Sequence, residues 1–232
     1  MSIWHIRESP TCAKKLWPKG DLSADDLVAR SSNLKNRKSI FAVSLFWRHS
    51  PTPIPPAQLE LLVEDFDEDY FESDGCYFVS EHLRQVMALG PSTVKYFDVD
   101  AGRSTPLVRS KKYKIMAPLV VDELSGRPSS AERPNKVTPI GDSASKEIHT
   151  QQGVVPSHEL FSGKEFSNQI LCTDFLAQKI IEAGCTGIRL YDLKHYNRGR
   201  KIFRTRHGFE ESLGWDADND VEITKPFEPS DE

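Results

Sequence analysis

The sequence predicts an α/β or α+β fold in which two similar strand–helix–strand units share a mixed sheet, with a less regular N-terminal lobe. Three observations lead to this prediction. The same pattern of apolar run, helix N-cap, amphipathic stretch, glycine and second apolar run occurs at residues 77–99 and at residues 170–193. Residues 125–158, between the two segments, are rich in Ser, Pro and Gly, as long irregular connections are. A chain of 232 residues is also long enough to bury a full core.

The two segments agree position by position. With one additional residue in the second helix, the alignment pairs Phe78 with Leu171, Ser80 with Thr173, Glu81 with Asp174, Leu83 with Leu176, Gly90 with Gly184, Val94 with Ile188, Lys95 with Arg189 and Asp98 with Asp192. This agreement indicates a duplicated structural unit. Two unrelated units that share the same strand and cap signals would give a similar pattern.

Each copy contains the residues that a short helix between two strands requires. Ser80 and Thr173 are favoured N-caps, because their hydroxyls accept hydrogen bonds from the first turn of a helix. Glu81 and Asp174 place negative charge at the positive end of the helix dipole. Apolar residues then recur at i, i+3 and i+4 on one helix face. They are Leu83, Val86 and Met87 in the first copy, and Ala177, Ile180 and Ile181 in the second.

Four further elements follow from local signals outside the repeats. A continuous apolar run predicts a buried strand at Ile40–Trp47. Pro56 suits the first turn of a helix, and apolar residues continue the helical spacing through Phe66. Further strands are expected at Tyr113–Val121, which contains a proline that favours an edge or a bulge, and around Lys201–Phe203.

These elements divide the chain into three parts. Residues 1–56 form the N-terminal lobe with a proline-rich bridge. Residues 57–209 form the body that contains both repeats, and residues 210–232 form a polar, acidic tail with Trp215 as its only anchor.

Composition excludes several classes of protein. No apolar run reaches the ~20 residues of a membrane helix, and the N-terminus lacks the apolar core of a signal peptide. Four scattered cysteines form neither a disulfide framework nor a metal-binding pair, which favours a reducing, cytoplasmic compartment. Motifs for phosphate loops, zinc proteases and nucleophile elbows are absent from the sequence. We therefore expect no catalytic residue, metal or cofactor; the alternative is an enzyme with an unrecognised site that gathers Asp98, Asp192 or His195.

Charge is distributed unevenly along the chain. Residues 64–74 hold seven carboxylates and no basic residue, whereas residues 189–207 hold seven Lys or Arg and one acid. The acidic run is either a solvated face, a partner for the basic segment of the same chain, or a surface that binds another protein. The basic segment, interleaved with aromatic residues, has the composition of a nucleic-acid patch. Its candidate residues are Lys194, Arg198, Arg200, Lys201, Arg204 and Arg206.

The first repeat resembles a known family. Asp65–Tyr70 is an acidic and aromatic lead-in to a strand that ends in Val-Ser-Glu, followed by Leu83 in an amphipathic helix and then a second strand. This arrangement is similar to that of the bacterial polymorphic-toxin immunity family numbered eleven, formerly a domain of unknown function. Tyr113, the Val-Asp-containing segment that ends at Ser125, and the second strand–cap–helix–strand at Leu171–Leu193 extend the resemblance over about residues 60–195.

The resemblance implies an immunity protein of interbacterial competition. Such a protein binds a cognate secreted toxin in the cytoplasm, occludes its active site and needs no catalysis or cofactor. We expect the acidic run to imitate phosphate groups in a basic toxin cleft, with aromatic anchors beside the carboxylates. The predicted toxin-binding residues are Glu64, Asp65, Phe66, Asp67, Glu68, Asp69, Tyr70, Phe71, Glu72 and Asp74. The alternative is a nucleic-acid-binding regulator that uses residues 194–206.

Overall fold

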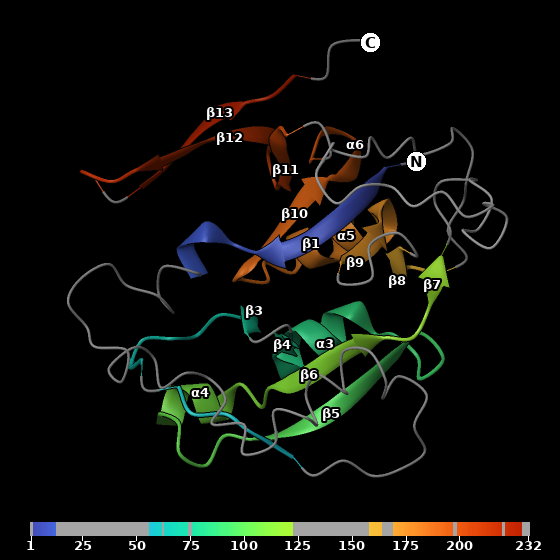
Figure 1. Cartoon of the computed structure of the whole chain (residues 1–232), viewed down its shortest axis with the longest axis vertical. Coiled ribbons are helices and arrows are strands. Elements are labelled where there is room, and N and C mark those ends of the chain that lie inside the picture. The colour runs from blue at the N-terminus through green and yellow to red at the C-terminus, as the bar shows by residue number, and fades with distance from the viewer. Residues whose placement is uncertain are drawn as a thin grey trace, which may run out of the picture.

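The structure is a computed structural model that describes residues 2–12, 56–61, 63–73, 76–122, 158–163, 169–196, 199–219 and 221–228. Within these ranges the strands form two sheets, one of five strands and one of eight, with short helices beside them (Figure 1). The mixed helix and strand content confirms the predicted fold class. The strands divide between two sheets, however, where the sequence predicted one. The expected strand at Ile40–Trp47 and the long connection at 125–158 lie largely or wholly outside the described residues.

The five-stranded sheet occupies the lower half of Figure 1 and has the order β2–β5–β6–β4–β3. Its strands are β2 (Ala57–Gln58), β3 (Tyr70–Ser73), β4 (Cys76–Val79), β5 (Val94–Asp100) and β6 (Lys114–Pro118). Two helices connect them: α3 (Glu81–Met87) between β4 and β5, and α4 (Pro106–Ser110) between β5 and β6.

The eight-stranded sheet occupies the upper half and has the order β13–β12–β11–β10–β1–β9–β8–β7. Its strands are β1 (Ile3–Glu8), β7 (Val121–Asp122), β8 (Leu160–Gly163), β9 (Ile170–Thr173), β10 (Ile188–Asp192), β11 (Lys201–Thr205), β12 (Gly208–Asp216) and β13 (Val221–Pro226). Helix α5 (Asp174–Glu182) connects β9 to β10, and α6 (Leu193–Tyr196) follows β10.

The two repeats share one strand plan. In the first, the antiparallel strand β6 lies between β4 and β5; in the second, β1 lies between β9 and β10. The two outer strands of each set are therefore parallel, as the expected crossover requires, with one strand inserted between them. A hairpin partner completes each unit, with β3 beside β4 and β8 beside β9. Helices α3 and α5 pack against each other.

The strand registers confirm the alignment of the repeats. Lys114 in β6 lies opposite both Val79 and Asp98. Trp4 in β1 lies opposite Cys172 and Asp192. The residues that flank the inserted strand are thus the aligned ones in both units. The backbone repeats too, since Ser80 N–H donates to the Asp69 carbonyl, and Thr173 N–H donates to that of Glu159, at 2.8 Å and 3.0 Å.

The inserted strand of the second unit is the first strand of the chain. The sequence placed residues 3–8 in a separate N-terminal lobe, whereas the structure places β1 in the middle of the larger sheet. Ile3, Trp4, His5 and Ile6 are all buried, because the sheet pairs with both edges of this strand and side chains cover its faces. The run IWHIRE looks mixed in polarity because it contains a buried histidine, which local patterns do not predict.

The helix expected after Pro56 does not form. Residues 57 and 58 form β2, and the chain continues irregularly to β3. The backbone groups of Leu59 and Leu61 find partners outside a helix. Ser104 Oγ accepts from Leu61 N–H at 2.9 Å and donates to the Leu59 carbonyl at 2.9 Å, while Leu59 N–H donates to Asp100. These long-range bonds and the burial of both leucines override the helical spacing.

The segment from Glu210 onward, expected as an acidic tail, is part of the sheet. It forms most of β12 and all of β13, a hairpin on the β11 edge. Two of its carboxylates pair with arginines of the basic segment. Glu211 binds Arg200, and Glu222 binds Arg189 at 2.8 Å. Two acidic charges of this segment are thus compensated by the sheet that it joins.

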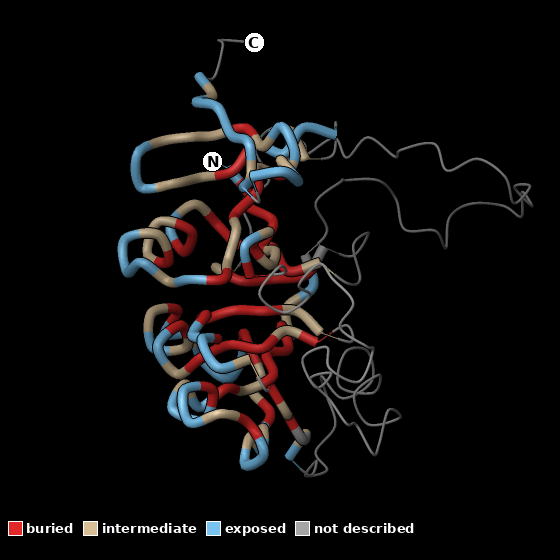
Figure 2. Tube along the Cα trace, turned by 90° about the vertical axis from the view of Figure 1, so that its left-hand side faces the viewer, coloured by how far each residue is buried: buried red, intermediate tan, exposed pale blue. Residues whose placement is uncertain are grey.

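One apolar core lies between the two units. It contains Trp4, Tyr70, Leu83, Leu176 and Ile180, so strands and helices of both units contribute. A second core lies within the first unit and includes Phe71 of β3 and Phe78 of β4. Figure 2 shows the buried segments along the strands of both sheets and where the sheets face each other. The described helices are all too short or too polar to cross a membrane.

The two N-caps are expected to differ in energy. Ser80 Oγ accepts from Leu83 N–H at 3.0 Å and donates to Asp69 at 2.7 Å, whereas the Thr173 side chain makes no cap bond. We expect Ser80→Ala to lower the free energy of unfolding by ~1–2 kcal/mol. Thr173→Ala should cost under ~0.5 kcal/mol, because its buried hydroxyl has no hydrogen-bond partner. Urea denaturation of the two variants measures both values, and equal losses would contradict the difference in capping.

Candidate functional site

The acidic run does not form one exposed surface. Phe66, Tyr70 and Phe71 have no exposed side-chain surface, and they pack in the cores on either side of β3. They cannot serve as aromatic anchors for a partner in this structure. Glu68 and Asp69 are buried as well, and Glu72 is half-buried. The exposed members are Glu64, Asp65 and Asp67, while Asp74 lies outside the described residues.

Asp69 is a buried connection between the two units. One of its oxygens accepts from Ser80 Oγ at 2.7 Å and lies 3.5 Å from Lys111 Nζ. The other accepts from Thr186 N–H, at 3.0 Å, in the turn before β10. His82 Nδ1 lies 3.4 Å from the same oxygen. Asp69 is 3% exposed, so the α3 cap, the lysine and the second unit meet on one carboxylate.

Asp69 also belongs to the group of side chains with the closest resemblance to a metal site in the described residues. The ligand atoms of Asp69, His82 and Cys185 lie within 4.8 Å of one another. Both Asp69 oxygens already accept hydrogen bonds, and an ammonium group lies beside one of them. Burial, with the nearby Asp69 charge, raises the pKa of the Cys185 thiol to about 12, which disfavours the thiolate that metals bind. The arrangement therefore favours a structural role for Asp69.

A pair of carboxylates, Glu8 and Glu72, joins β1 to β3. Glu8 N–H donates to Glu72 Oε1 at 3.0 Å, and Glu72 N–H donates to Glu8 Oε1 at 3.2 Å. Arg7 and the Tyr70 hydroxyl also contact Glu72. Desolvation by burial raises the pKa of Glu8 to about 7, and hydrogen bonds to its carboxylate oppose this shift only in part. The junction between the units thus contains a carboxyl group that titrates near neutral pH.

We expect Glu8→Gln to stabilise the protein more at pH 8 than at pH 5. The folded-state pKa of Glu8 is above its ordinary value of 4.5, so the folded state holds this proton more tightly than the unfolded state. Stability is therefore lost as pH rises from about 4.5 to about 7. Glutamine keeps an oxygen acceptor and removes this loss, a gain of about 1–3 kcal/mol above pH 7. Thermal denaturation of both proteins across this range measures the gain; a difference that does not change with pH would contradict it.

The basic segment is largely engaged with groups of its own chain. Arg200 donates to both Glu211 oxygens, at 2.9 Å and 3.1 Å. Arg204 binds Asp174 and Gln178 and lies over the Trp4 ring. Lys194 and Lys201 are exposed, and Arg198 lies outside the described residues. The segment therefore presents fewer uncompensated cations than its composition indicates.

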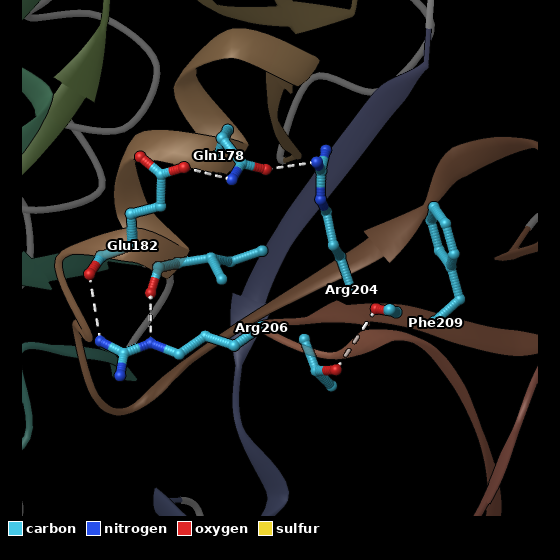
Figure 3. A pocket seen from close by; sticks show the side chains of 8 residues that line it. Gln178, Glu182, Arg204, Arg206 and Phe209 are labelled. Carbon is cyan, nitrogen blue, oxygen red and sulfur yellow. Dashed lines mark hydrogen bonds between the residues drawn. The ribbon is translucent and has the colours of Figure 1, made fainter.

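A pocket of about 470 Å³ lies where α5 meets β11 and β12 (Figure 3). Its lining includes Arg204, Arg206 and Phe209. Arg206 donates to the carbonyls of Ile181 and Glu182 at 3.1 Å and 3.0 Å, which caps the C-terminal end of α5. Both arginines point into bonds with the helix, so the pocket offers an anion little free positive charge.

The carboxylates considered for catalysis have separate partners. Asp98 is exposed on the five-stranded sheet and pairs with Lys114 at 2.5 Å. Asp192 ends β10 in the other sheet and accepts from Lys194 N–H at 2.8 Å, which caps α6. His195 lies beside Asp192, at 3.4 Å. The equivalence of Asp98 and Asp192 follows from the repeat and does not bring them into one site.

The β12–β13 hairpin combines exposed apolar and acidic residues. It lies at the upper edge of the larger sheet and extends away from the rest of the molecule (Figure 1). Leu213, Val221 and Ile223 are 56%, 51% and 46% exposed. Carboxylates occur on both strands and in the turn between them. This surface was not predicted, because residues 210–232 were expected to form a tail; the alternation in VEITK is the sequence signal for a strand.

Comparisons with protein-family models and with curated proteins find no match to this chain.

Proposed function

We propose that this chain is an immunity protein that binds a cognate secreted bacterial toxin in the cytoplasm and neutralises it by occluding the toxin's active site. The observation that carries this proposal is the repeat. The motif that resembles the immunity family occurs in a unit that folds twice with the same strand order and register. The resemblance supplies the class of partner, and the repeated scaffold is consistent with a protein that works by binding.

The internal hydrogen bonds of the basic segment support toxin binding over the alternative role in nucleic-acid binding. The carboxylate of Glu211 binds Arg200. The first turn of α5 binds Arg204 through Asp174, and the C-terminal end of α5 binds Arg206 through a backbone carbonyl. Nucleic-acid binding through this segment would require these arginines to exchange internal partners for phosphates. The aromatic residues of the acidic run are buried in the cores, so they do not anchor a partner. The surface that binds the toxin therefore lies elsewhere on this protein or includes only the exposed carboxylates of the run.

The test is co-expression with the toxin domain encoded beside this chain's gene. Growth of cells that make the toxin domain, only when this protein is also made, supports the proposal. A complex that survives affinity purification in high salt provides the biochemical counterpart. A toxic domain that this protein neither binds nor neutralises contradicts it. Nucleic acid that co-purifies and elutes as salt rises, with no protein partner, would favour the regulator instead.

A further inference from the structure

We infer that the β12–β13 hairpin is the surface that holds the toxin, and that the toxin contributes a basic, extended segment that pairs with the outer edge of β13. This inference rests on the proposed function, and it names the part of the molecule and the chemistry of the partner. Four features of the hairpin support it: its exposed apolar side chains, its charge, its open edge and its attachment to the sheet.

The apolar residues are concentrated on this hairpin. Six large hydrophobic side chains are exposed in the described part of the chain, and three of them are Leu213, Val221 and Ile223. Single exposed apolar residues are normal on a protein surface, whereas a group on one projecting element is typical of an interaction site. Five of the six β13 residues are exposed.

The charge of the hairpin defines the partner. Residues 208–228 contain seven carboxylates and one lysine, a formal charge of −6. Glu211 and Glu222 are paired with arginines outside the hairpin. Glu210, Asp218 and Glu228 remain on the accessible surface, so the field around the apolar residues is negative. A basic partner would be attracted to this surface, and a second copy of this chain would be repelled.

The edge of β13 is open to another strand. Its inner side pairs with β12 from Val221 to Pro226, and no strand of the described residues pairs with its outer side. Edge strands are usually protected by charged side chains. Lys225 and Pro226 protect the C-terminal end of β13. Between residues 221 and 224, however, the only charge is Glu222, whose side chain is 9% exposed and bound to Arg189. The outer edge thus offers unpaired backbone groups beside exposed valine and isoleucine, which suits strand addition.

The hairpin is held in place before any partner binds. Arg189 and Arg200 attach its two strands to the rest of the sheet through Glu222 and Glu211. In the turn, Asp216 accepts from the N–H groups of Asp218 and Asn219 at 2.9 Å and 3.2 Å. A pre-ordered edge lowers the entropy cost of binding an extended segment.

The experiment measures binding of the neighbouring-gene toxin domain to two matched variants. Val221→Ser combined with Ile223→Ser removes the apolar edge and should weaken binding by ~10-fold or more. Val121→Ser is the control, because Val121 is 49% exposed on β7, the opposite edge strand of the same sheet. It should leave the affinity unchanged. Equal melting temperatures of the variants and the wild type show that each variant is folded.

A second measurement tests the strand pairing and the charge. Hydrogen exchange of the amides of residues 221–225 should slow in the complex. Asp218→Lys with Glu228→Lys should reduce the association rate and its dependence on salt.

The outcomes separate this inference from the proposed function. The inference is overturned, and the immunity role is left intact, if the Val221→Ser, Ile223→Ser variant binds the toxin as tightly as the wild type does. The same holds if toxin binding leaves the hydrogen exchange of β13 unchanged. A wild-type protein that does not bind the toxin overturns both. Self-association of the wild type that is lost in the hairpin double variant would replace the basic partner with a second copy of the chain.

Discussion

Gly187→Ala is expected to destabilise the junction between the two units by about 2–5 kcal/mol. Gly187 has a φ of +75°, in the left-handed region. An added Cβ would lie 2.2 Å from the Tyr70 carbonyl oxygen and 2.8 Å from Glu68 Cβ. The backbone strain costs roughly 1–2 kcal/mol and the overpacking roughly 1–3 kcal/mol. Urea denaturation measures the loss, because the turn before β10 and the start of β3 would have to separate.

Gly199→Ala separates the two contributions. Gly199 has a similar φ of +79°, but a Cβ added there meets no atom within 4 Å. This variant should lose only the cost of the left-handed conformation, roughly 1–2 kcal/mol. A loss as large as that of Gly187→Ala would mean that the close approach to Tyr70 contributes nothing.

The repeat was predictable because its signals are local. The caps at Ser80 and Thr173, the apolar helix faces and the strands on either side lie within about one ~25-residue window each. The strand predicted at Tyr113–Val121 contains β6, but its insertion between β4 and β5 was not predicted, and neither was β1. β1 and β9 are more than 160 residues apart in sequence, so no local pattern shows that Trp4 lies opposite Cys172. The duplicated plan is therefore complete only in three dimensions. In the first unit the middle strand, β6, follows the two outer strands in the sequence, whereas in the second unit the middle strand, β1, precedes them.

The candidate site shows the same limit. The sequence identified the charge of residues 64–74, but composition does not distinguish a solvated carboxylate from a buried one. Three residues contact the buried Asp69 carboxylate as donors: Ser80, Lys111 and Thr186. Thr186 is 117 residues away in the sequence. The hairpin partners of the two units show the same limit. Tyr70 and Phe71 lie opposite Val79 and Phe78, as Leu160 and Phe161 lie opposite Cys172 and Leu171, but the two connections differ by three residues, so a backward extension of the alignment does not pair these strands.

Asp69→Ala is expected to lower the free energy of unfolding by about 3–5 kcal/mol, because it leaves the Lys111 ammonium and two other donors without their shared acceptor. Asp65→Ala, an exposed neighbour in the same acidic run, should change it by less than ~0.5 kcal/mol. If the two variants lose equal stability in urea, Asp69 is not the connection between the units.

Burial alone would raise the pKa of Asp69, but hydrogen bonds from Ser80 and Thr186, with the charge of Lys111, hold the pKa below its ordinary value of 3.8. This stabilisation is present above pH 3.8 and is lost as pH falls towards the folded-state pKa, so the difference between wild type and Asp69→Ala should shrink in acid.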